Sequence, residues 1–116
     1  DLDNPANRKF VEDFKKAYNR SPTLYASQGY DAAMLLDSAV RQTGGKLEAD
    51  ALRPALRRAD FKSVRGDFKF NRNQYPVQNY YLRVVEAGAD GKLANKLSGT
   101  VLTQYQDPFA AACQMK

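Results

Sequence analysis

Residues 30–40 have the sequence YDAAMLLDSAV, which is apolar except for two aspartates and one serine. At helical spacing these residues make the helix apolar around most of its circumference. A helix of this kind is covered by other parts of a protein on more than one side. Ser27 is the expected N-cap, and Gly44-Gly45 is expected to end the helix after about Gln42, because glycine adopts the left-handed C-terminal cap conformation easily. This helix is therefore expected to need packing partners on several faces.

Two further helices are expected on either side of this one. The first begins at Asn4-Pro5 and ends before Pro22, because asparagine suits an N-cap and the residue before a proline avoids the helical region. The third runs from about Asp50 to Ala59. Each has one apolar stripe at helical spacing: Phe10, Val11, Phe14, Ala17 and Tyr18 in the first helix, and Leu52, Ala55, Leu56 and Ala59 in the third.

After residue 66 the pattern changes from helical spacing to alternation, which is typical of strands. Phe68 and Phe70 alternate with polar residues, Gln78 to Glu86 is rich in Tyr and Val, and Ser98 to Tyr105 forms a third candidate strand. The chain is thus expected to have an α/β fold, with about three helices followed by about three strands. Three strands cover only one side of a helical layer, so we expect the isolated chain to dimerise, to exchange segments or to need further sequence.

Composition excludes several classes of chemistry. The 116 residues contain no histidine and one cysteine, so a Ser-His-Asp triad, a Cys-His pair and a zinc site built on these residues are excluded. Asp31 and Asp37 lie on different helix faces and do not form a catalytic carboxylate pair. We expect no enzyme activity, no metal and no cofactor. Cys113 is interpreted either as a small apolar residue or as the partner of a cysteine outside this chain.

No apolar run exceeds five residues, whereas a membrane-spanning helix needs about 20. The chain begins at Asp1 and carries no secretory signal, so it is expected to be a processed or trimmed product, and a location outside the cytoplasm stays open.

The net charge of +5 is concentrated in residues 53–72. This segment contains seven basic and two acidic residues, so its own net charge is 7 − 2 = +5. With phenylalanines interleaved, such a segment can be a nucleic-acid-binding surface. The alternative is a solvated helix face followed by an edge strand. We favour the alternative and expect no nucleic-acid partner, because no nucleic-acid-binding motif accompanies the segment. The basic residues are Arg53, Arg57, Arg58, Lys62, Arg65, Lys69 and Arg72, and the acidic ones are Asp60 and Asp67.

A series of short motifs along almost the whole chain closely resembles the C-terminal third of the periplasmic solute-binding proteins of ABC importers. The branch is the one typified by the leucine/isoleucine/valine-binding protein. No single motif is specific, but their order and spacing are. The motifs are DNPAN at residues 3–7, FV at 10–11, YA at 25–26, QGYDAA at 28–33, GG at 44–45, ALRPAL at 51–56, GDFKF at 66–70, PVQ at 76–78 and DPF at 107–109.

The resemblance implies a partial type I periplasmic-binding-protein fold. Such proteins have two α/β lobes joined by three crossing segments, and they clamp an amino acid or a related small carboxylate between the lobes. Residues 1–116 would form a single, incomplete segment. Its helical part, about residues 4–61, would belong to the first lobe, and about residues 67–116 would supply strands that cross between the lobes and the C-terminal tail.

The resemblance also implies partners and a location. They are a small-molecule ligand, an inner-membrane ABC permease, the remainder of the protein's own chain, and the periplasm. A sensor built on the same fold is the related alternative. The family proteins are about three times longer, so this segment alone is not expected to hold a ligand tightly.

Two ligand-binding residues are expected, Tyr25 and Gln28. In the resembling proteins an aromatic residue just before the second helix packs on the ligand, and Tyr25 occupies that position. Gln28 lies at the same helix N-terminus, where anions are favoured and a side-chain amide can donate to a carboxylate. The other interpretation of Tyr25 is a core aromatic residue with a satisfied hydroxyl.

Overall fold

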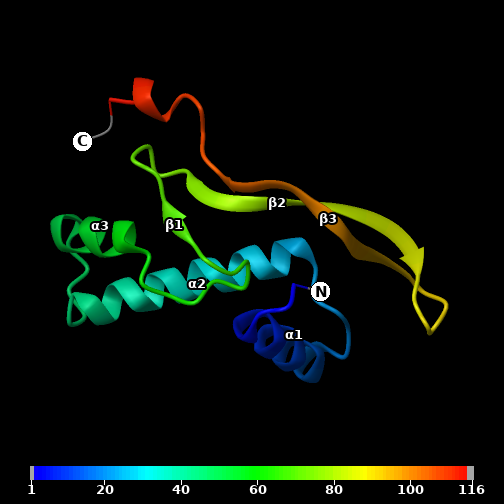
Figure 1. Cartoon of the computed structure of the whole chain (residues 1–116). Coiled ribbons are helices and arrows are strands. Elements are labelled where there is room, and N and C mark those ends of the chain that lie inside the picture. Colours follow the sequence, from blue (N-terminus) through cyan, green and yellow to red (C-terminus); the bar gives the residue numbers. More distant parts are fainter. Residues whose placement is uncertain (1, 115–116) are drawn as a thin grey trace.

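The computed structural model describes residues 2–114, and along this part of the chain three helices precede three strands (Figure 1). The strands form one antiparallel sheet in the order β1-β2-β3. The predicted α/β class and the order of elements are confirmed. The elements are α1 (Pro5–Tyr18), α2 (Leu24–Gln42), α3 (Ala49–Arg58), β1 (Lys69–Phe70), β2 (Pro76–Ala87), β3 (Leu93–Tyr105) and a short 3₁₀ helix, η1 (Ala110–Ala112).

Helix α1 begins where the sequence predicts. The Asn4 side-chain oxygen accepts a hydrogen bond from the Asn7 backbone N–H at 2.8 Å, and Pro5 occupies the first turn. The Asn4 side-chain nitrogen also donates to the Val64 carbonyl at 3.0 Å, so the same cap ties α1 to a distant loop. Phe10, the buried aromatic residue of α1, contacts Tyr30 of α2 with ring centroids 4.9 Å apart.

Helix α2 begins four residues earlier than predicted, and the assignment of Ser27 as its N-cap is wrong. Thr23 is in extended conformation and its hydroxyl accepts from the Ala26 N–H at 3.3 Å. Ser27 lies inside the first turns, and its hydroxyl donates back to the Leu24 carbonyl at 2.6 Å. Both are good capping residues, and in the structure the residue that caps the helix is Thr23, directly after Pro22.

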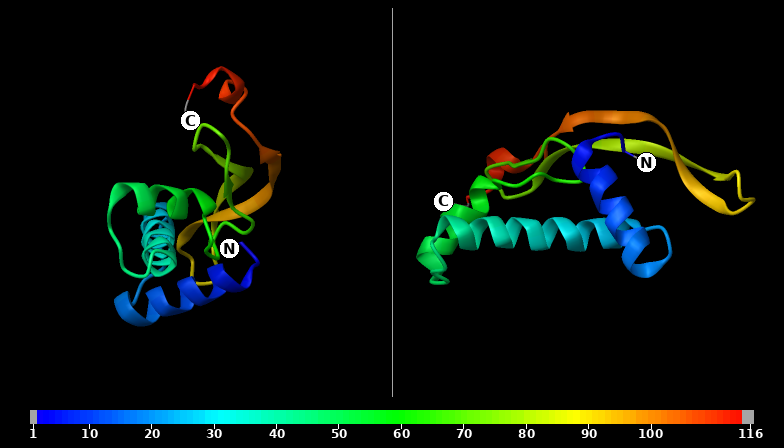
Figure 2. Two further views of the ribbon diagram at one scale, coloured as in Figure 1. Left: turned by 90° about the vertical axis from the view of Figure 1, so that its left-hand side faces the viewer. Right: turned by 90° about the horizontal axis from the view of Figure 1, so that it is seen from below.

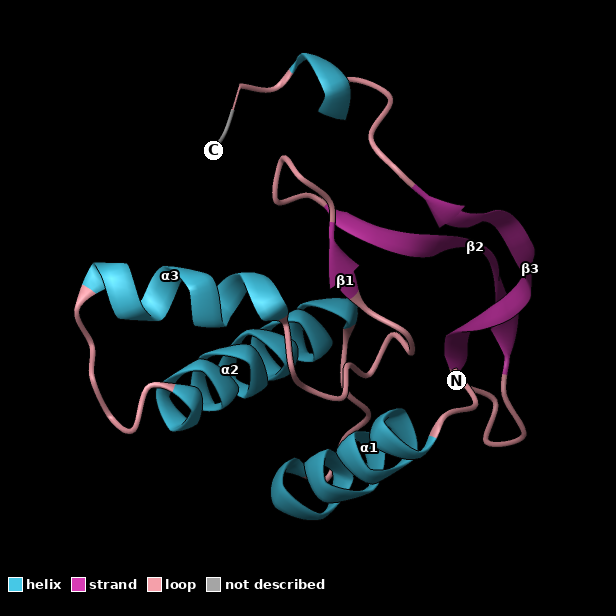
Figure 3. Cartoon of the chain, turned by 60° about the vertical axis from the view of Figure 1, so that its left-hand side comes forward, coloured by secondary structure: helices cyan, strands magenta, loops and turns pink. Residues whose placement is uncertain are grey.

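Helix α3 packs alongside α2 (Figure 3). Ala39 on α2 and Ala55 on α3 are fully buried, and small side chains of this kind allow two helices to approach closely. Arg58 at the end of α3 donates from Nε to the Gln42 side-chain oxygen at 2.6 Å, which joins the two helix ends. The packing partners that α2 needs are thus partly supplied by α1 and α3.

The predicted third strand is too short. Strand β3 begins at Leu93 rather than Ser98, because Leu93–Leu97 pairs in register with Arg83–Ala87 of β2. These added residues, LANKL, contain no β-branched or aromatic side chain, so their own strand preference is low and the partner strand imposes the conformation.

The β2–β3 hairpin projects beyond the helices at one end of the molecule (Figures 1 and 2). The radius of gyration is 16.6 Å, against about 13 Å for a compact chain of this length. Large apolar side chains on the hairpin are exposed, including Val85 at 61%, Leu93 at 75% and Val101 at 62%. The hairpin therefore leaves much apolar surface uncovered within the described chain.

The C-terminal tail returns to the turn between β1 and β2. The Asn73 side chain donates to the Asp107 carboxylate at 2.5 Å, and Arg72 donates to the Cys113 carbonyl at 3.3 Å. Cys113 itself is half-buried and its thiol is free. Among residues 2–114, no helix has the length and apolar character required to cross a membrane.

Candidate functional site

A buried carboxylate fixes the loop that follows α3. Asp31 is only 3% exposed, and its two oxygens accept from the Ser63 hydroxyl at 2.6 Å and from the Val64 N–H at 3.0 Å. Arg65 Nε lies 3.4 Å from the same carboxylate. Asp31 therefore holds residues 63–65 against the middle of α2 and sets the position of the Arg65 side chain.

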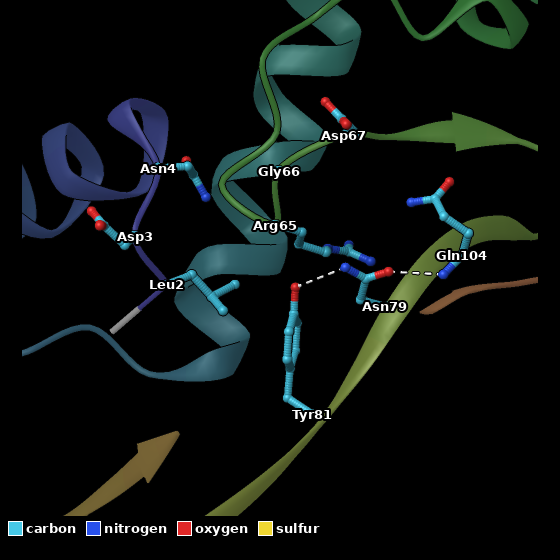
Figure 4. A pocket seen from close by; sticks show the side chains of 9 residues that line it. All are labelled: Leu2, Asp3, Asn4, Arg65, Gly66, Asp67, Asn79, Tyr81 and Gln104. Carbon is cyan, nitrogen blue, oxygen red and sulfur yellow. Dashed lines mark hydrogen bonds between the residues drawn. The ribbon is translucent and has the colours of Figure 1, made fainter. Parts of the chain in front are cut away.

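The guanidinium of Arg65 extends from this anchor toward the hairpin. It donates to the Gln78 side-chain oxygen at 2.8 Å, and it lies over the Phe68 ring with its central carbon 5.5 Å from the ring centroid. Beside it lies a hollow of about 230 Å³ between the N-terminal segment, the loop after α3 and the base of the hairpin (Figure 4). We call it the polar hollow; its lining residues are Leu2, Asp3, Asn4, Arg65, Gly66, Asp67, Asn79, Tyr81 and Gln104.

A distortion of the hairpin places amide groups in the polar hollow. Gln104 has φ of 49°, an unusual left-handed conformation within a strand, and its N–H donates to the Asn79 side-chain oxygen at 2.8 Å. The pairing register of β2 shifts between Gln78 and Tyr80, on either side of Asn79. The Asn79 amide nitrogen is 3.4 Å from the Tyr81 hydroxyl, and both side chains lie near Arg65 (Figure 4). Strained, non-glycine backbone of this kind is concentrated at functional sites.

The polar hollow has the chemistry of a binding site. Guanidinium, amide and phenol groups can bind polar or anionic groups through hydrogen bonds. No described lining residue is a histidine or a cysteine, and no group of three or more potential metal ligands occurs in the described part of the chain. The arginine, amide and phenol side chains of the hollow therefore suit recognition of a polar group through hydrogen bonds.

The predicted ligand residues lie outside this hollow. Tyr25 is in the first turn of α2 and is 81% exposed, and Gln28 is one turn further along and also exposed. Within the described residues, Tyr25 is therefore not packed in the core. Spaced three residues apart, the two side chains occupy the same side of the helix end.

Sequence reasoning missed Asn79 and Gln104. The available signal was the composition of the strands, since asparagine is disfavoured in a strand interior and its occurrence there marks a special local role. Their meeting depends on hairpin register, which the sequence does not reveal.

The basic segment of residues 53–72 is distributed over α3, the loop after it, β1 and the following turn. Several of its arginines make intrachain contacts, among them Arg57 with Gln74, Arg58 with Gln42, Arg65 with Asp31, and Arg72 with the Cys113 carbonyl. These contacts favour a structural role for part of the segment over a nucleic-acid-binding surface.

Comparison with known protein families identifies the family to which this fold belongs. The family described as "Periplasmic binding protein" matches residues 1–92. The chain therefore belongs to the periplasmic binding protein family, whose members bind solutes and are not enzymes.

Individual relatives of this chain are also named as solute- or amino-acid-binding proteins. The Leu/Ile/Val-binding protein homolog 6 of Brucella abortus (strain 2308) is 35% identical over 97 residues, which are 81% of this chain and 25% of that protein. A solute-binding protein of an ABC transporter from R. palustris, solved with benzoate, is 39% identical with a TM-score of 0.84. The match covers 98% of this chain and 30% of the other.

A second structure, from Rhodopseudomonas palustris BisB5 with 3,4-dihydroxybenzoic acid, is 33% identical with a TM-score of 0.78, covering 91% of this chain and 29% of that one. A leucine-binding protein from Thermotoga maritima, 24% identical with a TM-score of 0.65, shows the shared fold alone. This chain thus spans 25–30% of the length of these relatives, which confirms the prediction of a partial periplasmic-binding fold.

Proposed function

We propose that this chain is part of the solute-binding component of an ABC importer, and that the complete protein binds a small carboxylate. The observation that carries the proposal is the likeness to the benzoate-bound R. palustris protein, which extends over 98% of this chain at a TM-score of 0.84. A second relative was solved with another aromatic carboxylate, and a curated relative is named for branched-chain amino acids. The shared ligand chemistry is one carboxylate on a small organic body.

In this proposal the segment contributes to both lobes. Residues 4–61 belong to the first lobe, and residues 67–116 cross toward the second and form its tail. The polar hollow supports this division, because the N-terminal segment, the loop after α3 and the base of the hairpin meet there (Figure 4). A ligand that contacts both lobes shifts the population toward the closed state, and no bond is made or broken.

Tyr25 and Gln28 are the proposed ligand contacts within this segment. Tyr25 presents an aromatic ring that is 81% exposed, and such a ring packs well on a flat or branched apolar group. Gln28 lies near the N-terminus of the 19-residue helix α2, where an anion is favoured. Further partners in the proposal are the rest of the two-lobed chain and an inner-membrane permease, with the periplasm as the location.

Calorimetric titration of the two-lobed protein with benzoate and with leucine tests the proposal. We expect saturable binding of at least one, together with a ligand-dependent rise in melting temperature. Binding of neither ligand, or binding of an oligonucleotide with a steep salt dependence, would contradict it. Uptake of the bound ligand by cells with and without the gene then separates an importer component from a sensor.

A further inference from the structure

A second hollow is lined by side chains of α2, α3, β1 and the turn after β1, and it shares no residue with the polar hollow. Its volume is about 550 Å³, which is within the range of about 300–1,000 Å³ typical of small-molecule sites. We call it the basic hollow; it is lined by Leu35, Arg53, Leu56, Arg57, Phe70 and Gln74.

The base of the basic hollow is apolar. Leu35 of α2, Leu56 of α3 and Phe70 of β1 are half-buried and contribute one side chain from each element. The Phe70 ring is held edge-on against the Phe68 ring with centroids 5.1 Å apart. An apolar base with a fixed aromatic ring suits the body of a small organic molecule.

The rim of the basic hollow is cationic. Arg53 and Arg57 are one helical turn apart, so both guanidinium groups are on the same side of α3. With the Gln74 amide oxygen facing Arg57, that oxygen accepts from Nη2 at 3.1 Å and from Nε at 3.3 Å, which orients the guanidinium. Arg53 is exposed and forms no ion pair within residues 2–114, and no described lining residue carries a carboxylate.

We propose that the basic hollow is a second ligand site, separate from Tyr25, for a monocarboxylate with an aromatic or branched apolar body. Guanidinium groups match the geometry of a carboxylate and can bind it through two parallel hydrogen bonds. The apolar base contacts the apolar body of the ligand. The site prefers an anion because its described lining residues include two arginines and no acidic residue. The site consists of α2, α3, β1 and the following turn alone, so it does not depend on the two-lobed clamp.

The test is an NMR titration of the ¹⁵N-labelled two-lobed protein, in which these residues have their packing partners, with benzoate, benzyl alcohol and acetate. Benzyl alcohol keeps the ring and removes the charge, whereas acetate keeps the charge and removes the ring. We expect saturable shifts of the Leu35, Leu56 and Phe70 amides with benzoate, and binding of each comparison compound weaker by about tenfold, as for loss of one charge-assisted contact. Shifts confined to Tyr25 and Gln28, or equal binding of all three probes, would overturn the proposal.

Variants on one helix separate the site from general electrostatics. Arg53→Gln is expected to weaken benzoate binding by about tenfold. Arg58→Gln removes the same charge from the same helix, but Arg58 faces Gln42 and does not line the hollow, so its binding should stay within about twofold of the wild type. Equal losses in the two variants would reject the site.

Two more variants complete the design. Arg53→Lys keeps the charge without the planar fork and should give an intermediate affinity, which checks that Arg53→Gln does not act by unfolding. Tyr25→Ala should leave binding in the basic hollow unchanged. The proposal for the basic hollow and the proposal for the ligand site at Tyr25 and Gln28 can therefore be refuted independently of each other.

Discussion

Asp31 joins the helical part of the chain to the segment that leads into the sheet. Its hydrogen bonds to Ser63 and Val64 connect residues 32 and 33 positions apart, and its side chain is almost fully buried. A buried carboxylate is tolerated only when it is well satisfied, and here three donors surround it. Asp31 is therefore a structural anchor. Its carboxyl group and its position on an apolar helix had made it a residue to compare with catalytic carboxylates.

We expect Asp31→Asn to lower the free energy of unfolding by about 2 kcal/mol, because an amide nitrogen would face hydrogen-bond donors in a buried site. The control is Asp37→Asn on the same helix, whose ion pair with Arg41 is exposed and contributes less than about 0.5 kcal/mol. Urea unfolding followed by circular dichroism measures both. Equal effects in the two variants would show that Asp31 is not the anchor.

Tyr25→Ala is expected to weaken ligand binding by the two-lobed protein without lowering the melting temperature of its ligand-free form. The ring is 81% exposed, so its removal takes little packing away from this segment. Tyr75→Ala is the matched control, since Tyr75 is 65% exposed on a turn away from α2. Titration calorimetry and thermal unfolding provide the two readouts, and an unchanged affinity in Tyr25→Ala would dismiss Tyr25 as a ligand contact.

At the scale of elements, the start of α2 decides where the proposed ligand residues lie. With Thr23 as the cap, Tyr25 is inside the first helical turn and not in an extended segment before it. Helix geometry then fixes the direction of the Tyr25 ring and the direction of the Gln28 side chain. The one-turn difference between prediction and structure therefore changes how the two side chains are presented.

The cap assignment can be checked by a pair of alanine substitutions. Thr23→Ala should lower the free energy of unfolding by about 1 kcal/mol, because the Ala26 N–H loses its partner. Ser27→Ala should change it by less than about 0.5 kcal/mol, because a hydroxyl that bonds back to a carbonyl within a helix stabilises little. Chemical denaturation compares the two, and the reverse order would restore Ser27 as the cap.

At the scale of the whole molecule, the hairpin carries much of the apolar surface that is exposed among the described residues. Its apolar side chains are exposed and the molecule measures 51 × 34 × 19 Å, which is elongated for its length. Contiguous apolar surface of this kind marks an interface. The chain spans only 25–30% of its relatives, and we propose that the remainder of a two-lobed protein covers the hairpin.

The 116-residue chain by itself is therefore expected to self-associate as its concentration rises. Val101→Lys on the hairpin should reduce the association, because a charge on an exposed edge strand opposes pairing with another chain. Leu47→Lys, at a 66% exposed loop position, is the control and should leave the association unchanged. Sedimentation velocity measures all three proteins. A compact monomer at every concentration would contradict the expectation.

The sequence by itself determined the class of the fold, the order of its elements and the boundaries of α1 and α3. These features depend on contacts between residues a few positions apart, such as the Asn4 cap and the apolar stripes. Motif order along the chain also determined the family, because spacing is a property of the sequence.

Tertiary structure alone decided the full length of β3, the junction of Arg65 with Asp31, and the residues of the two hollows. Leu93–Leu97 becomes a strand only because β2 lies beside it, and Asn79 meets Gln104 only through the register of the hairpin. Such contacts are fixed by how whole elements pair and pack and not by local preference.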